Sequence, residues 1–476
     1  SELREPLESR VMAGFGGVAE YGITVRWDKN FLKMARLLVE RRHEFAVIGG
    51  VRFGGTLTAQ DAFAMGFDHI ALAAGAGKPT VLDMPNGLAR GVRTASDFLM
   101  ALQLTGAART DSIANLQVRL PIVVIGGGLT GIDTATESLA YYPVQVEKFL
   151  ARYETLVAER SAASVRNEWN EEETNVAEEF LTHALAIRAE REAATREGRE
   201  PRVLELLQSW GGSTLAYRKR LVDSPSYTLN HEEVEKALEE GIRFAENLTP
   251  REVKLDQYGH ACALAVRSTA TDAEGNMTEQ DIELPARTVL IAAGTQPNTV
   301  LAREDAEHFV LDGRYFRAVD ENGDPVKPER SAKPAVPRVL MSRDSEDRYL
   351  SYFGDLHPSF FGNVVKAMGS AKQGYPTVSR VLLRRPSRPA GDAATFITHL
   401  NSQLRATVHH VERLTPRIVE VVVHAPIAAR KFLPGQFYRL QNFETQAARP
   451  DGTTLAMEGL ALTGAWVDRD KGLVST

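Results

Sequence analysis

The segment PIVVIGGGLTGIDTA, residues 121–135, decides the fold. Four of its first five residues are Ile or Val, typical of a buried strand, and a helical pattern follows the glycines. Glycines spaced as Gly-x-Gly-x-x-Gly permit a tight turn and let the backbone approach a pyrophosphate at a helix N-terminus. The segment predicts a dinucleotide site, although a ligand-free strand-to-helix turn is the alternative. The predicted binding loop consists of Gly126, Gly127, Gly128, Leu129, Thr130 and Gly131.

The next strand-like segment, STLAY at 213–217, ends in basic residues. In NAD-binding units a carboxylate that binds the ribose stands roughly 20 residues after the glycine loop. Here the residues after the strand are Arg218, Lys219 and Arg220, with no carboxylate. Guanidinium groups suit a 2′-phosphate. We therefore predict NADPH as the nucleotide, with Arg218 and Arg220 as phosphate ligands; a solvated basic turn is the alternative.

A charged helical stretch at 145–208 separates these two motifs. Within it, Val176, Phe180, Ala184 and Ile187 recur at helical spacing, which indicates one apolar stripe on a solvated surface. We interpret the stretch as a surface insertion, with a partner-binding arm as the alternative. A second helix is predicted to have Asn230 as its N-cap, with Glu233 three positions on, and to end at Gly241. Its Val234 and Leu238 are expected to share one buried face.

Two segments of the chain echo each other, HIALAAGAGKP at 69–79 and TVLIAAGTQPN at 288–298. They are either unrelated buried strands or two crossings between nested domains, and Gly294 in the second is a predicted cofactor contact. Residues 318–348 are predicted to form loop and residues 384–392 a linker. Beyond residue 400 the apolar residues alternate, which predicts the start of an antiparallel barrel or sandwich.

Composition narrows the function further. The 476 residues allow several domains, and no stretch approaches the roughly 20 apolar residues of a membrane helix. A net charge of −6 gives no reason to expect nucleic acid, so we expect no nucleic-acid or membrane partner and a cytoplasmic location. Cys262 is the one cysteine, which rules out a CxxC pair or a four-cysteine iron–sulfur or zinc site. We expect it to be a small buried residue of a strand, and we expect no metal site.

The order of many segments resembles the glutamate synthase small-subunit family, FAD- and NADPH-binding proteins of the pyridine nucleotide-disulfide oxidoreductase class. The resemblance covers about residues 12–380. The segments that carry it are GGVAEYGITVRWDKNFL (16–32), ALAAGAGKP (71–79), GVRTASDFL (91–99), VVIGGGLTGIDTA (123–135), LAYRKR (215–220), NHEEVEKALEEGI (230–242), LIAAGTQPN (290–298), FGD (353–355) and NVVKAMGSAKQG (363–374).

This resemblance implies an α/β protein with two nested Rossmann-like domains. An FAD-type domain would comprise 1–105 and 300–385, and an NADPH domain 106–299 would carry the insertion at 145–208. The FAD would be held by Gly354, Asp355, Asn363 and Val364. The implied activity is hydride transfer from NADPH to FAD, with electrons passed onward to a partner subunit or iron–sulfur domain.

Three features depart from the family: the FAD-binding glycine loop, the N-terminal cysteine region that ligates iron–sulfur clusters in the relatives, and the insertion at 145–208, which is larger than the family's. The family's FAD-binding glycine loop is expected upstream of Gly16, and GFGG at 14–17 has neither the spacing nor a preceding strand. We therefore expect the sequence to be a fragment of a longer protein. The segment FLPGQFYRL at 432–440 resembles the flavin barrel of ferredoxin-reductase-like proteins, so 396–476 is expected to form a partial β-barrel. The alternative function is a catalytically silent module that positions a partner subunit.

Overall fold

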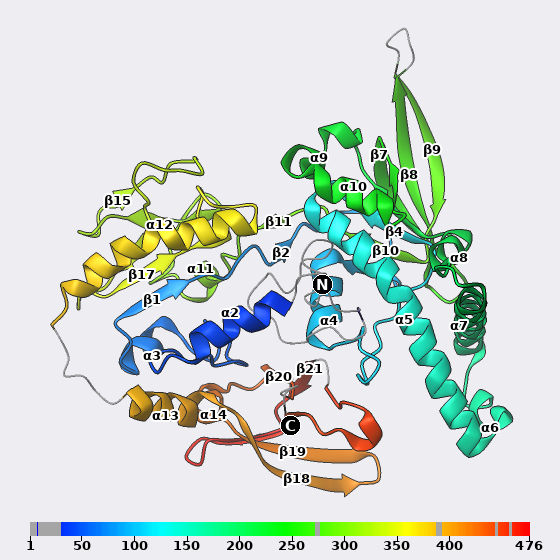
Figure 1. Ribbon diagram of the computed structural model, residues 1–476. Helices are drawn as coiled ribbons and strands as arrows, with labels where there is room; N and C mark the ends of the chain where they lie inside the picture. The colour runs from blue at the N-terminus through cyan, green and yellow to red at the C-terminus, as the bar shows by residue number, and fades with distance from the viewer. Residues whose placement is uncertain (1–6, 8–29, 272–276, 387–392, 443–445, 457–458) are drawn as a thin grey trace. The chain divides into compact units, whose positions relative to one another are not determined.

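The computed structural model describes residue 7 and residues 30–271, 277–386, 393–442, 446–456 and 459–476 (Figure 1). The GFGG segment at 14–17 and the first part of the segment at 16–32, up to residue 29, lie outside these ranges. Among the described residues, no helix has the length and apolar character that crossing a membrane would require. The mixed α/β architecture predicted from the sequence is confirmed.

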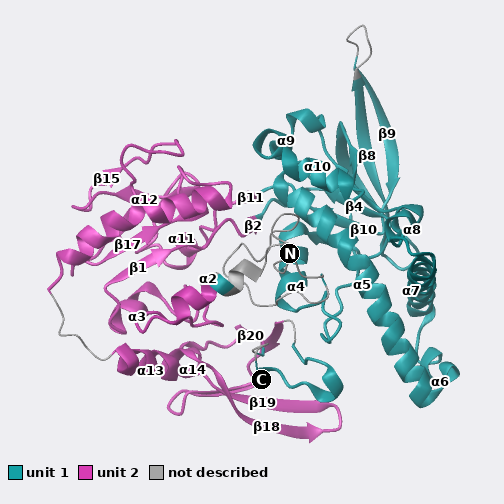
Figure 2. Cartoon of the chain, in the orientation of Figure 1, with its two compact units in different colours: residues 1–35, 79–294, 442–458 teal, residues 36–78, 295–441, 459–476 magenta. Residues whose placement is uncertain are grey.

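The chain forms two compact units (Figure 2). Unit 1 comprises 1–35, 79–294 and 442–458, and unit 2 comprises 36–78, 295–441 and 459–476. The chain therefore leaves unit 2 and returns to it around residues 78 and 295, close to the two echoing segments. Helix α2 (Asn30–Glu40) and strand β2 (Lys78–Pro79) lie across these divisions.

Unit 1 is built on a five-stranded parallel sheet of order β3-β10-β4-β5-β6. Its strands are β3 (Val92–Thr94), β4 (Ile122–Ile125), β5 (Ser213–Ala216), β6 (Arg243–Ala245) and β10 (Thr288–Ile291). All four residues of β4 are buried, because β4 is central and both faces of the sheet are covered. Each such side chain contributes about 1.5–3 kcal/mol by leaving water.

Helices cover one face of this sheet, where Ile122 and Val124 pack. The core on this face includes residues of α4 (Ala95–Leu104), α5 (Leu129–Arg160), α7 (Glu171–Glu197), α8 (Val203–Ser209) and α10 (His231–Glu239). The unit also contains α6 (Ala162–Arg166) and α9 (Pro225–Leu229), with the 3-10 turn η3 (Leu221–Asp223) before α9. A second 3-10 turn, η6 (Pro450–Gly452), lies in the 442–458 part of the unit.

The stretch predicted as a helical insertion is helical, but it has no separate beginning. Helix α5 starts at the glycine loop and continues for 32 residues, past position 145, to Arg160. Helix α7 buries the predicted stripe, with Phe180, Ala184 and Ile187 all in the core. Its own capping box and a left-handed Gly198 define its two ends.

The predicted N-cap position at Asn230 is confirmed, but the capping expected of its side chain is not observed. Helix α10 begins at His231, but the Asn230 side chain makes no capping hydrogen bond. Asn230 is also the C-cap residue of α9, and its backbone N–H donates to the carbonyl of Ser226, 2.9 Å away. Its backbone is thereby held away from the usual N-cap geometry. Leu238, expected on the buried face, is 54% exposed, and Ala237 is buried instead.

A three-stranded antiparallel sheet covers the other face of the parallel sheet. It consists of β7 (Leu248–Leu255), β8 (Ala261–Thr271) and β9 (Met277–Pro285), and its Val253, Leu264 and Val266 pack with Val123 and Val289. The expectation that Cys262 is buried is wrong, because its side chain is exposed. A register shift between Lys254 and Leu255, opposite this end of β8, breaks the simple alternation of faces.

Unit 2 contains a three-stranded sheet of order β1-β17-β16. Strand β1 (His69–Leu72) pairs in parallel with β17 (Tyr349–Tyr352), and β16 (Leu340–Arg343) pairs with β17 in antiparallel. The loop predicted over 318–348 is therefore wrong at β16. Shorter elements of the unit are α3 (Ala59–Ala64), β11 (Thr295–Gln296), α11 (Leu301–Glu304), β12 (Leu311–Asp312), β13 (Tyr315–Phe316), β14 (Ala318–Val319), β15 (Pro325–Val326) and η4 (Gly354–Leu356).

The last long helix of unit 2 is α12 (Val364–Leu383), which buries Ser370, Gly374, Thr377 and Val381. Beyond it, the described residues form helices α13 (Ala393–Leu404) and α14 (Pro426–Lys431) and two small antiparallel sheets. One sheet, of order β18-β19-β23-β22, consists of β18 (Thr407–Thr415), β19 (Ile418–His424), β22 (Trp466–Asp468) and β23 (Leu473–Ser475). The other pairs β20 (Phe437–Leu440) with β21 (Leu460–Thr463). The predicted antiparallel strands beyond residue 400 are confirmed.

Candidate functional site

The glycine loop connects β4 to α5 in the middle of the parallel sheet. Gly126 has φ +150°, and its N–H donates to the carbonyl of Ala216 at the end of β5, 3.0 Å away. On the other side, the N–H of Ala292 donates to the carbonyl of Ile125 at 2.8 Å. A Cβ on Gly126 would lie 2.2 Å from the carbonyl oxygen of Ala292. Glycine is therefore required where the three strands β5, β4 and β10 end together.

Gly127 is held by the segment that follows β5. A Cβ there would lie 2.5 Å from the ring of Tyr217, the residue just after that strand. The Gly127 carbonyl accepts hydrogen bonds from the N–H of Ser226 at 3.1 Å and from its hydroxyl at 3.0 Å. Because Ser226 is buried at the start of α9, these contacts tie the glycine loop to the residues after β5.

The remaining positions of the loop form the start of α5. Gly128 is the N-cap residue, with φ −93° and no side-chain cap, and a Cβ on it would meet no protein atom within 4 Å. Leu129 and Thr130 are the first helical residues, and a Cβ on Gly131 would lie 3.1 Å from the Gly126 carbonyl. An uncapped helix start with open space in front of it suits an anion.

Gly294 lies where the chain leaves unit 1. It has φ +98°, a left-handed conformation that favours glycine, and its carbonyl accepts from the N–H of Thr80 at 2.9 Å. It follows Ala292, the residue against which Gly126 packs, by two positions. The predicted contacts Gly126–Gly131 and Gly294 therefore belong to one region of unit 1.

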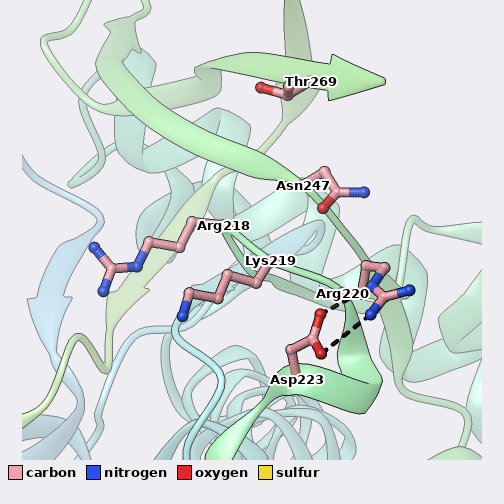
Figure 3. Close-up of a pocket in the computed structure, with 6 residues that line it drawn as sticks. All are labelled: Arg218, Lys219, Arg220, Asp223, Asn247 and Thr269. Atoms are coloured by element: carbon pink, nitrogen blue, oxygen red, sulfur yellow. Dashed lines mark hydrogen bonds and ion pairs between the residues drawn. The ribbon is translucent and has the colours of Figure 1, made fainter. Parts of the chain in front are cut away.

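The basic residues after β5 line a pocket of about 410 Å³ (Figure 3). Its lining residues are Arg218, Lys219, Arg220, Asp223, Asn247 and Thr269. Neither the Arg218 nor the Lys219 side chain forms a hydrogen bond or ion pair with the described part of the chain. They are exposed cations in a position where a phosphate could approach them.

Arg220, the other predicted phosphate ligand, is engaged by a carboxylate. Its Nε lies 2.8 Å from Oδ2 of Asp223, and its Nη2 lies 3.2 Å from Oδ1. The hydrogen bond from Arg220 lowers the pKa of Asp223, and that of Arg220 is raised in turn. A bidentate pair of this kind fixes the direction of the guanidinium plane. A phosphate would have to compete with Asp223 for Arg220.

Glu246, which directly follows β6, is a second carboxylate of this region that sequence reasoning missed. Its Oε1 accepts the N–H of Leu221 at 2.6 Å, and its charge also acts on Arg220. Sequence reasoning also missed Tyr217 and Ser226 as supports of the glycine loop. None of these three residues is marked by a sequence pattern. In this region only the ion pair between Arg220 and Asp223 has a sequence signal, the i,i+3 spacing of opposite charges.

The residues predicted to hold FAD come together in unit 2. Gly354, with φ +62°, follows β17, and its N–H donates to the Ser370 hydroxyl of α12 at 2.7 Å. Oδ1 of Asp355 accepts the N–H of Gly362 at 2.9 Å. Asn363 caps α12 by accepting the Lys366 N–H at 2.9 Å, and Val364 is its first helical residue. The corner between β17 and α12 thus presents a helix N-terminus beside a fixed carboxylate.

His357 is buried behind this corner. Its Nδ1 accepts the N–H of Ser359 at 3.1 Å, so its proton resides on Nε2, which has no hydrogen-bond partner in the described part of the molecule. Rings of Tyr352 and Phe360 pack around it. Burial lowers the pKa of His357 to about 4, so the ring is neutral at pH 7. It is a neutral packing residue behind the corner.

Metal binding is not indicated by the geometry. Within the described ranges, His, Cys, Asp and Glu side chains nowhere gather in a group of three that could hold a metal ion.

No protein-family model matches the chain. An uncharacterized protein of Rickettsia prowazekii is 37% identical over 487 residues, a match that covers all of this chain but 59% of the relative. The chain thus spans less than two thirds of that relative's length. Among solved structures, Mycobacterium tuberculosis FprA in complex with NADPH is similar over 82% of this chain and 81% of its own, with 12% identity and a TM-score of 0.41. Lactococcus lactis thioredoxin reductase is similar over 67% of this chain and 66% of its own, with 14% identity and a TM-score of 0.30.

Proposed function

We propose that the glycine loop and the basic residues of unit 1 bind NADPH. The observation that carries this proposal is that the glycines of the loop have different surroundings. A Cβ on Gly126 or Gly127 would collide with other protein atoms, whereas Gly128 faces open space at the start of a 32-residue helix. A pyrophosphate at that helix start would accept hydrogen bonds from backbone N–H groups, and the helix dipole would stabilise its negative charge.

The 2′-phosphate would be held one strand away by Arg218 and Lys219. Both cations follow β5, the neighbour of β4, and both lack a partner in the described residues. Lys219 takes the place of Arg220 in the pair named from the sequence, because Arg220 is already bound to Asp223. The Tyr217 and Ser226 contacts would keep the pyrophosphate and 2′-phosphate positions in a fixed relation.

The corner of unit 2 is the proposed FAD site. The Asp355 carboxylate, held by the N–H of Gly362, would accept hydrogen bonds from the hydroxyl groups of a ribityl chain. The N-terminus of α12 would face a pyrophosphate. When bound, NADPH would supply a hydride and FAD would accept it. The protein residues bind and orient the two groups; we assign none of them a proton-transfer role.

We further propose that the electrons pass to a partner subunit or iron–sulfur domain, as the resemblance to the glutamate synthase small-subunit family implies. The domain division predicted from the sequence is part of this proposal. Because the chain spans 59% of its relative, the activity of the whole protein is also a proposal. If the purified chain shows visible flavin absorbance that NADPH bleaches, the oxidoreductase is supported; a colourless chain that binds NADPH would favour the silent module.

Removing both free cations tests the choice of nucleotide. In the variant Arg218→Ala with Lys219→Ala, we expect NADPH affinity to fall roughly 30-fold, since each charged contact contributes on the order of 1 kcal/mol or more. NADH affinity should stay the same, so that the two affinities converge in titration calorimetry. The matched control is Arg188→Ala with Arg191→Ala on α7, which also removes two exposed positive charges. An unchanged preference for NADPH would refute the assignment of Arg218 and Lys219.

A further inference from the structure

Charge is unevenly compensated among the three basic residues after β5. Arg220 has a bidentate ion pair with Asp223, and Glu246 lies near enough to act on it as well. Arg218 and Lys219 form no side-chain hydrogen bond or ion pair within the described ranges, although the charge of Lys219 also acts on Asp223. Figure 3 shows the Arg218 and Lys219 side chains extending to one side of the turn, while the Arg220 guanidinium meets Asp223 on the other.

Asp223 is also fixed in place by the backbone around it. Its N–H donates to the Arg220 carbonyl at 3.0 Å, which closes the 3-10 turn η3. The next residue, Ser224, is buried and caps α9 through the N–H of Tyr227, 3.2 Å from its hydroxyl. Two positions later Ser226 binds the glycine loop. The carboxylate therefore belongs to a rigid segment shared with the nucleotide site.

We propose that Asp223 is a specificity-determining residue that holds Arg220 away from the 2′-phosphate and so limits the affinity for NADPH. This inference rests on the proposed NADPH site. The phosphate would meet two cations, Arg218 and Lys219, and the third would stay with its carboxylate. A dianionic phosphate and Asp223 compete for one guanidinium, because both match its planar donor geometry.

The experiment compares adenosine 2′,5′-bisphosphate with 5′-AMP by titration calorimetry, because the two differ only in the 2′-phosphate. The wild-type chain should bind the bisphosphate more tightly. In Asp223→Asn the bisphosphate should bind about fivefold more tightly, because it gains one exposed ion pair with Arg220. The affinity for 5′-AMP should stay constant. If the wild-type chain shows no preference, the proposed function itself fails. If it shows the preference but Asp223→Asn brings no gain, only the role of Asp223 fails.

A double-mutant cycle isolates the contribution of Arg220. Arg220→Ala alone should weaken bisphosphate binding less than twofold, whereas in the Asp223→Asn background it should remove the whole gain. A gain that survives Arg220→Ala would overturn the proposal, since it would come from lost negative charge alone. Glu154→Gln is the matched control, because Glu154 forms a bidentate pair with Arg188 at 2.7 and 2.9 Å on the exposed surface of unit 1. It removes the same charge and should change neither affinity.

Discussion

Replacing Gly126 by alanine is expected to destabilise unit 1 by about 3 kcal/mol and to weaken NADPH binding by about 100-fold. The added Cβ would lie 2.2 Å from the Ala292 oxygen and 2.8 Å from its carbonyl carbon, both backbone atoms at the end of β10. The backbone at φ +150° also disfavours an L side chain. The loop must therefore move away from β10, and a displaced loop no longer aims its N–H groups at a pyrophosphate.

Gly128→Ala is the matched variant, since it changes the same residue type two positions away. Its φ of −93° is allowed for alanine, and the new Cβ would contact no protein atom within 4 Å. Stability should change by no more than about 0.5 kcal/mol. NADPH affinity should still fall, because the methyl group would occupy the space in front of the helix.

Thermal unfolding and titration calorimetry on the two variants separate packing from binding. Gly126→Ala should lose both stability and affinity, and Gly128→Ala affinity alone. Full NADPH affinity in Gly128→Ala would show that the open side of the loop is not the pyrophosphate site. A Gly126→Ala chain as stable as the wild type would contradict the close approach of β4 and β10.

The sequence was sufficient for this loop because its signals are local. A buried strand, the glycine spacing and the helix start all fall within residues 121–135, and each agrees with the others. The strand β5 and the basic residues that follow it were also predicted from one short stretch of sequence. Its neighbours were not, because Ser226 and Glu246 approach the site through folding rather than through sequence spacing.

Elements that depend on distant pairing escaped prediction. Strand β16 lies in a Pro- and charge-rich stretch and forms by pairing with β17, so composition indicated loop there. Alternation along β8 predicted a buried Cys262, but the register shift between β7 and β8 makes Cys262 the unpaired extra residue of β8. An extra residue of this kind interrupts the alternation of faces, and Cys262 is exposed. Helix α5 runs through the predicted boundary at 145. Its buried face continues to Leu150, so the sequence shows no break at 145.

Glu179→Ala is expected to be the most destabilising surface-layer substitution that leaves the glycine loop untouched. The Glu179 carboxylate on α7 lies 2.6 Å from Nη2 of Arg119 and 2.5 Å from Nη1 of Arg287. The Arg119 side chain is only 3% exposed, so its charge has little access to water. Removing Glu179 would leave that guanidinium buried without its carboxylate, which costs about 3–5 kcal/mol.

Glu154→Ala is the control, at another ion pair of α7. Glu154 of α5 binds Arg188 of α7 with good bidentate geometry, but the two side chains are 49% and 44% exposed. Its loss should cost less than about 1 kcal/mol, because water replaces the carboxylate. Thermal unfolding followed by tryptophan fluorescence suits both variants, since Trp210 stacks on His183 of α7 with ring centroids 3.7 Å apart. Equal losses in the two variants would mean that α7 is held by its apolar stripe rather than by the buried charges.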